Sequence, residues 1–118
     1  MTGWAADWLR AFALTLGIEA LVATPLLARA DPRVGRRLAG ATLANLATHP
    51  LVWFLFPALA LGYPTRVALS EAFAVVLESA CYLTIWPALG PRRAALVSLL
   101  ANGASFGAGL LLRTQGWL

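Results

Sequence analysis

Four long apolar stretches, separated by short polar turns, leave this chain few ways to fold. They cover residues 8–28, 38–61, 67–89 and 94–112, and about 20 apolar residues are enough for a helix to cross a bilayer. In lipid each stretch must close its own backbone hydrogen bonds, which requires helices. Because the turns are short, consecutive helices should pack antiparallel. We therefore expect an all-α, polytopic membrane protein in which residues 1–118 form a single transmembrane domain, an up-down bundle of four helices.

The composition agrees with this class. Of the 118 residues, 60% are hydrophobic and 12% are charged, about half the charged fraction of ordinary soluble domains. The sequence Ala-Arg-Ala at 28–30 resembles a signal-peptide cleavage site, but Glu19 inside the first stretch and Asp7 before it argue against such a peptide. We expect the first stretch to be retained as a membrane span.

All nine basic residues are arginines, and their positions predict the orientation of the chain. Six lie in the turns around 29–37 and 90–93, and the other three are Arg10, Arg66 and Arg113. Basic residues are in excess in cytoplasmic loops. We expect a multi-pass protein of the inner (plasma) membrane with loops 29–37 and 90–93 in the cytoplasm and both termini outside. The aromatic residues expected at the outer boundary are Trp4, Trp8, Tyr63 and Trp117. The basic turns lack interleaved aromatics, so the expected partner is the lipid bilayer and not nucleic acid.

Residues 36–48 and 93–105 match at a constant offset, which suggests an internal repeat. The informative matches are Arg36/Arg93, Asn45/Asn102 and the similar pair Thr48/Ser105. Glu19 and Glu78 also occupy comparable places in the first and third stretches. Two helix pairs of the same topology would be related by an axis along the membrane normal. Alanine and leucine matches arise by chance in such helices, so the repeat remains one of two interpretations.

Three glutamates lie inside the apolar stretches, where a central carboxylate costs about 3 kcal/mol on insertion scales. Such residues face the bundle interior and indicate function by default. A rise of about 1.5 Å per residue places several polar side chains in one slab, about 12–21 Å from the cytoplasmic boundary. These are Glu19, Asn45, His49, Glu78 and Asn102. Glu71 lies nearer the outer surface.

Helical spacing places the polar residues on one stripe per helix. The stripes are Thr15 with Glu19, Asn45 with His49, Glu71 with Glu78 and Tyr82, and Asn102 with Ser105. We expect the four stripes to meet in a polar core. Pro50 lacks the N–H that would bond the carbonyl of Leu46, so the second helix should bend there.

This core favours a transporter-like protein that binds or conducts a small cation, either a proton or a divalent metal. The predicted site consists of Glu19, His49, Glu71 and Glu78, oriented by Asn45, Thr48, Tyr82, Asn102 and Ser105. Glu19 and Glu78 would be the exchangeable carboxylates, and His49 a ligand or proton relay. A metal cofactor would be held by His49, Glu78 and either Glu19 or Glu71, because nitrogen and oxygen ligands suit zinc, manganese or iron.

Two other functions fit the same residues. The polar core could specify helix packing only, in a non-catalytic membrane subunit or scaffold. An intramembrane enzyme acting on a lipid-soluble substrate is less favoured, because the sequence contains no phosphate loop, CxxC motif or serine elbow, and no residue is assigned a catalytic role. Gly103 and Gly107 form a small-xxx-small pattern that permits either internal packing or a homo-oligomer. Cys81 is interpreted as a small apolar packing residue.

The central glutamate of the first stretch, the segment Asn45-Leu-Ala-Thr-His-Pro50 and the Glu71…Glu78 pair resemble a pattern of small, uncharacterised bacterial four-helix membrane proteins. The resemblance covers nearly the whole chain and implies no activity. Length, helix number and the glutamate in the first stretch are also similar to small multidrug resistance transporters. His49, Glu71 and Glu78 have no counterpart in that second pattern.

Overall fold

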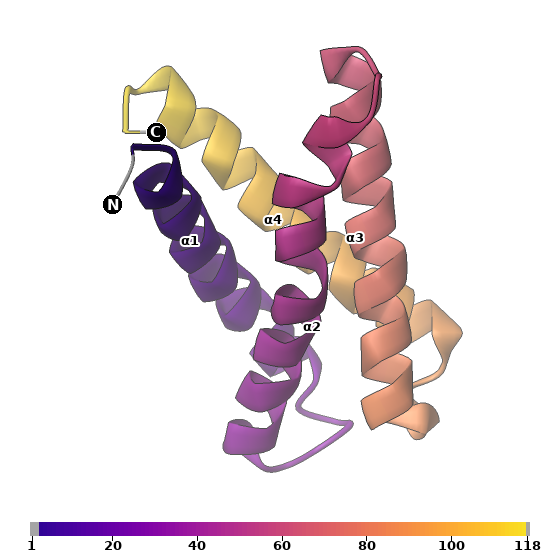
Figure 1. The fold of residues 1–118 in the computed structure, drawn as a ribbon. Helices are drawn as coiled ribbons and strands as arrows, with labels where there is room; N and C mark the ends of the chain where they lie inside the picture. The colour runs from indigo at the N-terminus through magenta and orange to yellow at the C-terminus, as the bar shows by residue number, and fades with distance from the viewer. Residues whose placement is uncertain (1–2, 118) are drawn as a thin grey trace.

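The computed structural model describes residues 3–117, and every regular element in this range is helical. The long helices are α1 (Gly3–Leu26), α2 (Val34–Phe54), α3 (Tyr63–Ile85) and α4 (Pro91–Thr114), and two 3-10 turns are η1 (Phe56–Ala58) and η2 (Pro87–Leu89). The four long segments are each long and apolar enough to cross a membrane (Figure 1). The all-helical prediction with four membrane-length helices is therefore confirmed.

Prolines and glycines set several helix ends. α3 and α4 each begin after a glycine, with a proline in the first turn, where the missing N–H would have no helical partner in any case. Gly90, just before α4, has a φ of 82°, a left-handed conformation that glycine adopts without strain. α2 continues through Pro50 but ends at Phe54, so the sequence-based limit at residue 61 is too late for an α-helix. Pro57, which lacks an N–H, lies in the 3-10 turn that follows.

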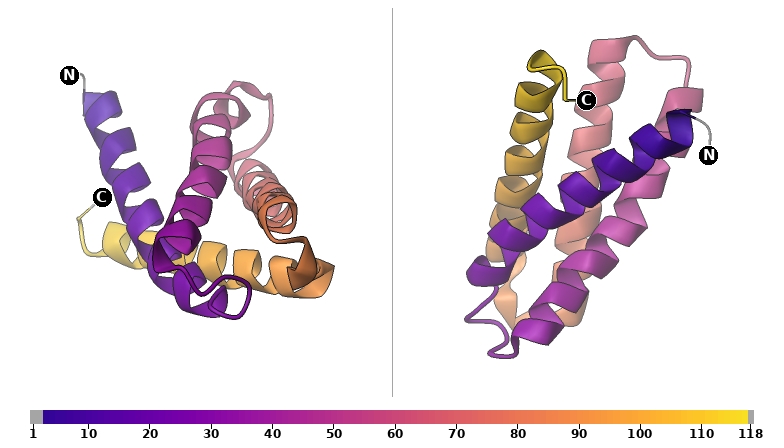
Figure 2. Two further views of the ribbon diagram at one scale, coloured as in Figure 1. Left: turned by 90° about the horizontal axis from the view of Figure 1, so that it is seen from below. Right: turned by 90° about the vertical axis from the view of Figure 1, so that its left-hand side faces the viewer.

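The helices form a ring in which α1 and α3 each pack against both α2 and α4. The four helices converge where the turns 27–33 and 86–90 lie, and α1 and α4 diverge from α2 and α3 toward the chain termini (Figures 1 and 2). We call the first end of the bundle, with turns 27–33 and 86–90, the closed end. The second, with the termini and the connection 55–62, is the open end.

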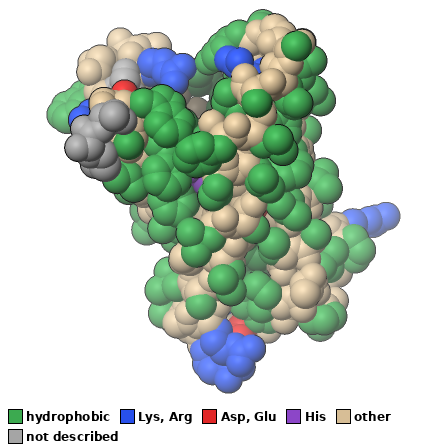
Figure 3. All heavy atoms as spheres, in the orientation of Figure 1, with side chains coloured by type: hydrophobic (Ala, Val, Ile, Leu, Met, Phe, Trp, Pro, Cys, Tyr) green, Lys and Arg blue, Asp and Glu red, His purple; other side chains and the backbone are tan. Residues whose placement is uncertain are grey.

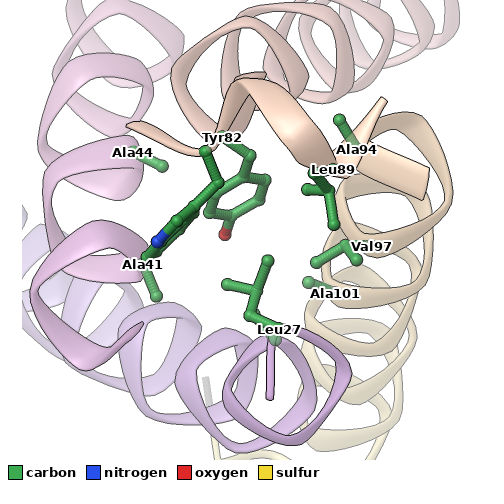
Figure 4. Close-up of a cluster of buried hydrophobic side chains, with 10 residues drawn as sticks. Leu27, Ala41, Ala44, Tyr82, Leu89, Ala94, Val97 and Ala101 are labelled. Atoms are coloured by element: carbon green, nitrogen blue, oxygen red, sulfur yellow. The ribbon is translucent and has the colours of Figure 1, made fainter. Parts of the chain in front are cut away.

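The apolar core lies at the closed end. Its buried residues are Ala23, Leu27, Ala41, Ala44, Tyr82, Trp86, Leu89, Ala94, Val97 and Ala101, with Cys81 among the residues packed against them. Many are alanines, which allow helix backbones to approach closely. Tyr82 and Leu27 point toward each other in the centre of this cluster (Figure 4). Trp86 stacks on Tyr82 with 6.3 Å between ring centroids, and it also packs over Gly40, where an added Cβ would lie 2.5 Å from the Trp86 Cη2 atom.

Asp31 links the α1–α2 turn to the end of α3. Its Oδ1 accepts hydrogen bonds from the backbone N and the Nε of Arg33, at 3.0 and 3.2 Å. Its Oδ2 accepts one from Trp86 Nε1 at 3.2 Å and pairs with Arg36 at 3.0 Å. The pKa of Asp31 is lowered to about 2, mainly by the backbone N–H of Arg33. This buried carboxylate therefore holds two turns of the closed end together.

The small-residue face of α4 points outward. Gly103 and Gly107 are exposed, and an added Cβ at either would meet no atom within 4 Å. These two glycines therefore do not mediate packing within the described part of the chain. A homo-oligomer contact at this face stays a prediction.

Candidate functional site

A cavity of about 390 Å³ occupies the open half of the bundle, and all four long helices line it. Its base, near the middle of the helices, is formed by Glu19, Asn45, Thr48, Glu78, Asn102 and Ser105. His49 and Glu71 lie on its walls, and Tyr63, Arg66 and Arg113 lie at its mouth. At this end the molecular surface is hollowed between α1 and α4 on one side and α2 and α3 on the other (Figure 3). The cavity thus collects most of the polar residues that the sequence placed inside the membrane.

Glu78, on α3, is bonded from two neighbouring helices. It is 1% exposed. Its Oε1 accepts a hydrogen bond from the Thr48 hydroxyl of α2 at 3.1 Å, and its Oε2 accepts a short one from the Asn102 amide of α4. Both oxygens of this carboxyl group therefore already receive a donor.

Glu19, on α1, is equally buried, at 1% exposed, but only one of its oxygens has a partner. Oε1 accepts a hydrogen bond from the Ser105 hydroxyl of α4 at 2.8 Å, and the Asn45 side chain of α2 also interacts with the carboxyl group. Oε2 has no hydrogen-bond partner among residues 3–117. A buried carboxyl oxygen without a donor is costly, so this atom needs an explanation.

The two glutamates are held in corresponding ways. Thr48 and Ser105 each donate to the glutamate of the other helix pair, whereas Asn45 and Asn102 each interact with the glutamate of their own pair. Each asparagine Nδ2 also donates to the carbonyl four residues earlier, at 3.0 and 2.9 Å. The segments matched in the sequence therefore make matching contacts around a common centre.

The carboxyl groups of Glu19 and Glu78 also interact with each other. Two carboxylates in contact inside a low-dielectric core cannot both be ionised without a large repulsion. A proton shared between the two carboxyl groups would supply Glu19 Oε2 with the partner it otherwise lacks. The geometry is thus suited to a carboxyl pair that shares one proton.

His49 lies in a cage of aromatic rings and not beside the carboxyl pair. Its ring centroid is 4.9 Å from that of Phe12, 6.0 Å from Trp53 and 6.3 Å from Trp8. Within residues 3–117 its Nδ1 has no hydrogen-bond partner, and no three His, Cys, Asp or Glu side chains in this range are grouped to hold a metal ion. The metal-ligand set expected from the sequence is therefore not assembled in this structure.

Glu71 and Tyr82 lie on opposite sides of Glu78. Glu71 is half-buried, lines the cavity toward its mouth and accepts no hydrogen bond from the described residues. Tyr82 is buried in the apolar core of the closed end, and its hydroxyl has no partner in the described part of the chain. The sequence analysis predicted that Tyr82 helps to orient the site. In the structure its phenol makes no hydrogen bond to Glu19 or Glu78.

The sequence analysis did not single out Ser98. This buried residue donates to the Val75 carbonyl of α3 at 2.8 Å, and its hydroxyl oxygen lies 3.3 Å from Asn102 Nδ2. It helps to fix the amide that bonds Glu78. Its spacing of four residues before Asn102 was a usable signal, because residues so spaced share a helix face.

The sequence analysis used Arg66 and Arg113 only to predict the orientation of the chain. In the structure both also line the cavity. Both line the mouth of the cavity and converge on Tyr63. The Arg66 guanidinium lies 5.7 Å from the centre of the Tyr63 ring, and Arg113 Nη1 donates to the Tyr63 hydroxyl at 3.2 Å. The mouth is therefore positively charged.

Comparisons with protein-family models, curated proteins and solved structures found no match for this chain. Helix bundles serve many unrelated functions, so function has to be argued from the site. The features that bear on function are the buried carboxyl pair, the cavity above it and the charges along the cavity wall.

Proposed function

We propose that this protein is an inner-membrane, transporter-like protein that binds and exchanges a proton at the Glu19–Glu78 pair. The observation that carries the proposal is the pairing of two interacting, buried carboxyl groups at the base of a cavity, with one of their oxygens lacking a donor among residues 3–117. Ionisable groups buried in this way within a membrane are typical of proton relays. A proton is the cation that two carboxyl groups can bind without further ligands.

The charge distribution supports an outward-facing cavity. The closed end carries the arginine-rich turns, and basic turns favour the cytoplasmic side. We infer that the closed end faces the cytoplasm and that the termini and the cavity mouth face outward. In that orientation water entering from outside reaches the carboxyl pair, whereas the apolar core of the closed end separates the pair from the cytoplasm.

The proposed exchange begins with the proton shared by Glu19 and Glu78. Water in the cavity accepts this proton, and Glu71, on the wall between the pair and the mouth, provides an acceptor on the way out. Loss of the proton leaves two carboxylates in contact, and their repulsion favours separation of α1 from α3. Thr48 and Ser105 keep each carboxylate hydrogen-bonded meanwhile. Proton occupancy is thus coupled to the spacing of the helix pairs, which we propose are related by a two-fold axis along the membrane normal.

Infrared difference titration of the protein in nanodiscs tests this proposal. We expect a signal from a protonated carboxyl group that disappears at alkaline pH and is shifted or lost in both Glu19→Gln and Glu78→Gln. Asp7→Asn, at an exposed site, is the matched control and should leave the signal unchanged. In liposomes carrying a pH-sensitive dye, the two glutamine variants should also abolish proton exchange.

A packing role is the second candidate, because Glu78 already has a donor on each oxygen. A scaffold would need those hydrogen bonds but no exchangeable proton. If Glu19→Gln and Glu78→Gln fold normally, and the carboxyl signal and proton exchange are those of the unmodified protein, the proton proposal is wrong. The packing role would then be the better account.

A further inference from the structure

We propose that the cavity binds a zwitterion, with its anionic group at Arg66 and Arg113 and its cationic group deeper, at Glu71. The proposal deepens the proposed function by naming the ligand of the same cavity. It rests on the order in which charged side chains follow one another from the mouth to the base.

The two arginines at the mouth have no acidic partner in the part of the chain that the structure describes. Within residues 3–117, the ion pairs involve Arg10, Arg33 and Arg36, and neither mouth arginine has a carboxylate within 4.0 Å. Instead both guanidinium groups converge on Tyr63, one on its ring and one on its hydroxyl. Two uncompensated guanidinium groups at a cavity mouth are suited to a phosphate or carboxylate.

The carboxyl group of Glu71 is the next charged group inward. It follows Arg66 by five residues on α3, so it lies about 7.5 Å deeper along the helix axis. Although it is only half-buried and lines the cavity, it has no ion pair or hydrogen bond with residues 3–117. It is therefore free to bind an ammonium group, with the Glu19–Glu78 pair still deeper.

A zwitterion satisfies both charged regions at once. A simple anion would meet the carboxyl of Glu71 as it entered, and a simple cation would be repelled by two guanidinium groups at the mouth. The remaining wall is largely apolar, with Trp53, Phe56 and Phe106 among its residues, and can cover a short carbon skeleton. A volume of about 390 Å³ lies in the range of small-molecule sites.

The chemical class is an ammonium compound that also carries a phosphate or carboxylate. Two sources provide it, namely the headgroup of a zwitterionic phospholipid and a free water-soluble zwitterion. Phosphoethanolamine is a probe that contains both charges, and inorganic phosphate and ethanolamine each contain one. The three compounds can be titrated into protein in nanodiscs of phosphatidylglycerol, a lipid without an ammonium group.

The readout is the unfolding temperature together with tryptophan fluorescence, because Trp53 lines the cavity. We expect phosphoethanolamine to raise the unfolding temperature saturably, with an affinity at least about tenfold above that for phosphate or ethanolamine alone. Arg66→Gln and Glu71→Gln should each weaken binding by about tenfold or more. Arg29→Gln at the closed end and Asp7→Asn near the N-terminus are charge-matched controls that should bind normally. Arg113→Gln replaces Arg66→Gln if that variant does not fold.

A second set of nanodiscs, made with phosphatidylethanolamine, distinguishes the two sources. If the lipid is the occupant, these discs should stabilise the protein and abolish the response to phosphoethanolamine, whereas persistence of the response indicates a free zwitterion. Equal affinity for phosphate with no effect of Glu71→Gln would show a simple anion site. Equal affinity for ethanolamine would show a cation site, and no response to any probe or to the lipid would also overturn the proposal. Each of these outcomes leaves the infrared signal of the Glu19–Glu78 pair intact, so failure here is separable from failure of the proposed function.

Discussion

The two ends of the bundle use their polar groups in opposite ways. At the closed end, Asp31 is buried but receives donors from Arg33 and Trp86 and pairs with Arg36, and it lies beside a continuous apolar core. At the open end the helices diverge around a cavity. There the charged side chains of Arg66 and Glu71 have no ion pair among residues 3–117.

This difference shows where the molecule can change shape. A packed apolar core resists local opening, whereas a region with few apolar contacts opens at low cost. The Glu19–Glu78 pair lies between the two regions, below the cavity and above the apolar core. A change in its protonation would hence act mainly on the open end. The following predictions test that contrast.

The largest effect is expected from Gly40→Ala at the closed end. The new Cβ would lie 2.5 Å from Trp86 Cη2, so α2 and the end of α3 must separate, at a cost of about 1–3 kcal/mol of stability. Gly35→Ala is the matched control in the same helix, because no atom lies within 4 Å of its Cβ position. Chemical unfolding in detergent measures both. Equal stability of the two variants would show that Trp86 does not pack tightly on α2.

Next in size are Thr48→Val and Ser105→Ala, which remove corresponding donors from Glu78 and Glu19. Each leaves a buried carboxyl oxygen with one donor fewer, so each should cost about 1–3 kcal/mol, and the two costs should be similar. Thr84→Val is the control, because among residues 3–117 that exposed hydroxyl bonds only the Ala80 carbonyl of its own helix. A cost for one variant alone would argue against the correspondence of the two helix pairs.

The sequence predicted which polar side chains converge better than it predicted the partner of each. Spacing along each helix placed Glu19, Asn45, Glu78 and Asn102 at one depth, and these side chains do meet. It also placed Tyr82 on the same face as Glu78. Tyr82 lies one helical turn beyond Glu78, toward the closed end. At that level the neighbouring helices contribute apolar residues, so the Tyr82 side chain packs in the apolar core. Spacing specifies a face of a helix, but the partner on that face depends on the other helices.

His49 illustrates the same difference at the open end. It follows Asn45 by one helical turn, yet α1 contributes Phe12 and Trp8 at that level, so the imidazole packs among rings. The link between Asp31 and Trp86 joins residues far apart in the chain, and no periodic pattern could predict it. Counting arginines likewise assigned Arg36 to a cytoplasmic turn but could not predict that it pairs with Asp31.

Acid should weaken the closed end through Asp31. The pKa of Asp31 is lowered from 3.8 to about 2 in the folded protein. The ionised carboxylate therefore stabilises the fold at pH values above the pKa that Asp31 has in the unfolded chain. That contribution should be complete above about pH 5 and should disappear as the pH falls through about 2. Asp31→Asn should remove this part of the acid dependence, as seen by comparing unfolding midpoints of the two proteins across this range. Asp7→Asn, at an exposed pair with Arg10, should retain it. If the Asp31→Asn protein keeps the full acid dependence, the carboxylate does not link the two turns.

The smallest effect on stability is expected at the mouth of the cavity. Arg113 is exposed, and its hydrogen bond to Tyr63 lies at the surface, so Arg113→Gln should change the free energy of unfolding by no more than about 0.5 kcal/mol. The matched arginine of the closed end is Arg37, which is buried and donates to the Thr24 carbonyl at 2.6 Å. Arg37→Gln should cost about 1–3 kcal/mol, because a partly buried backbone acceptor loses its partner. Comparison of the two variants by chemical unfolding separates an arginine that holds the fold together from one that is available to a ligand.

A large loss of stability in Arg113→Gln would show that the open end is held together by its own polar contacts, and the contrast between the two ends would then be wrong.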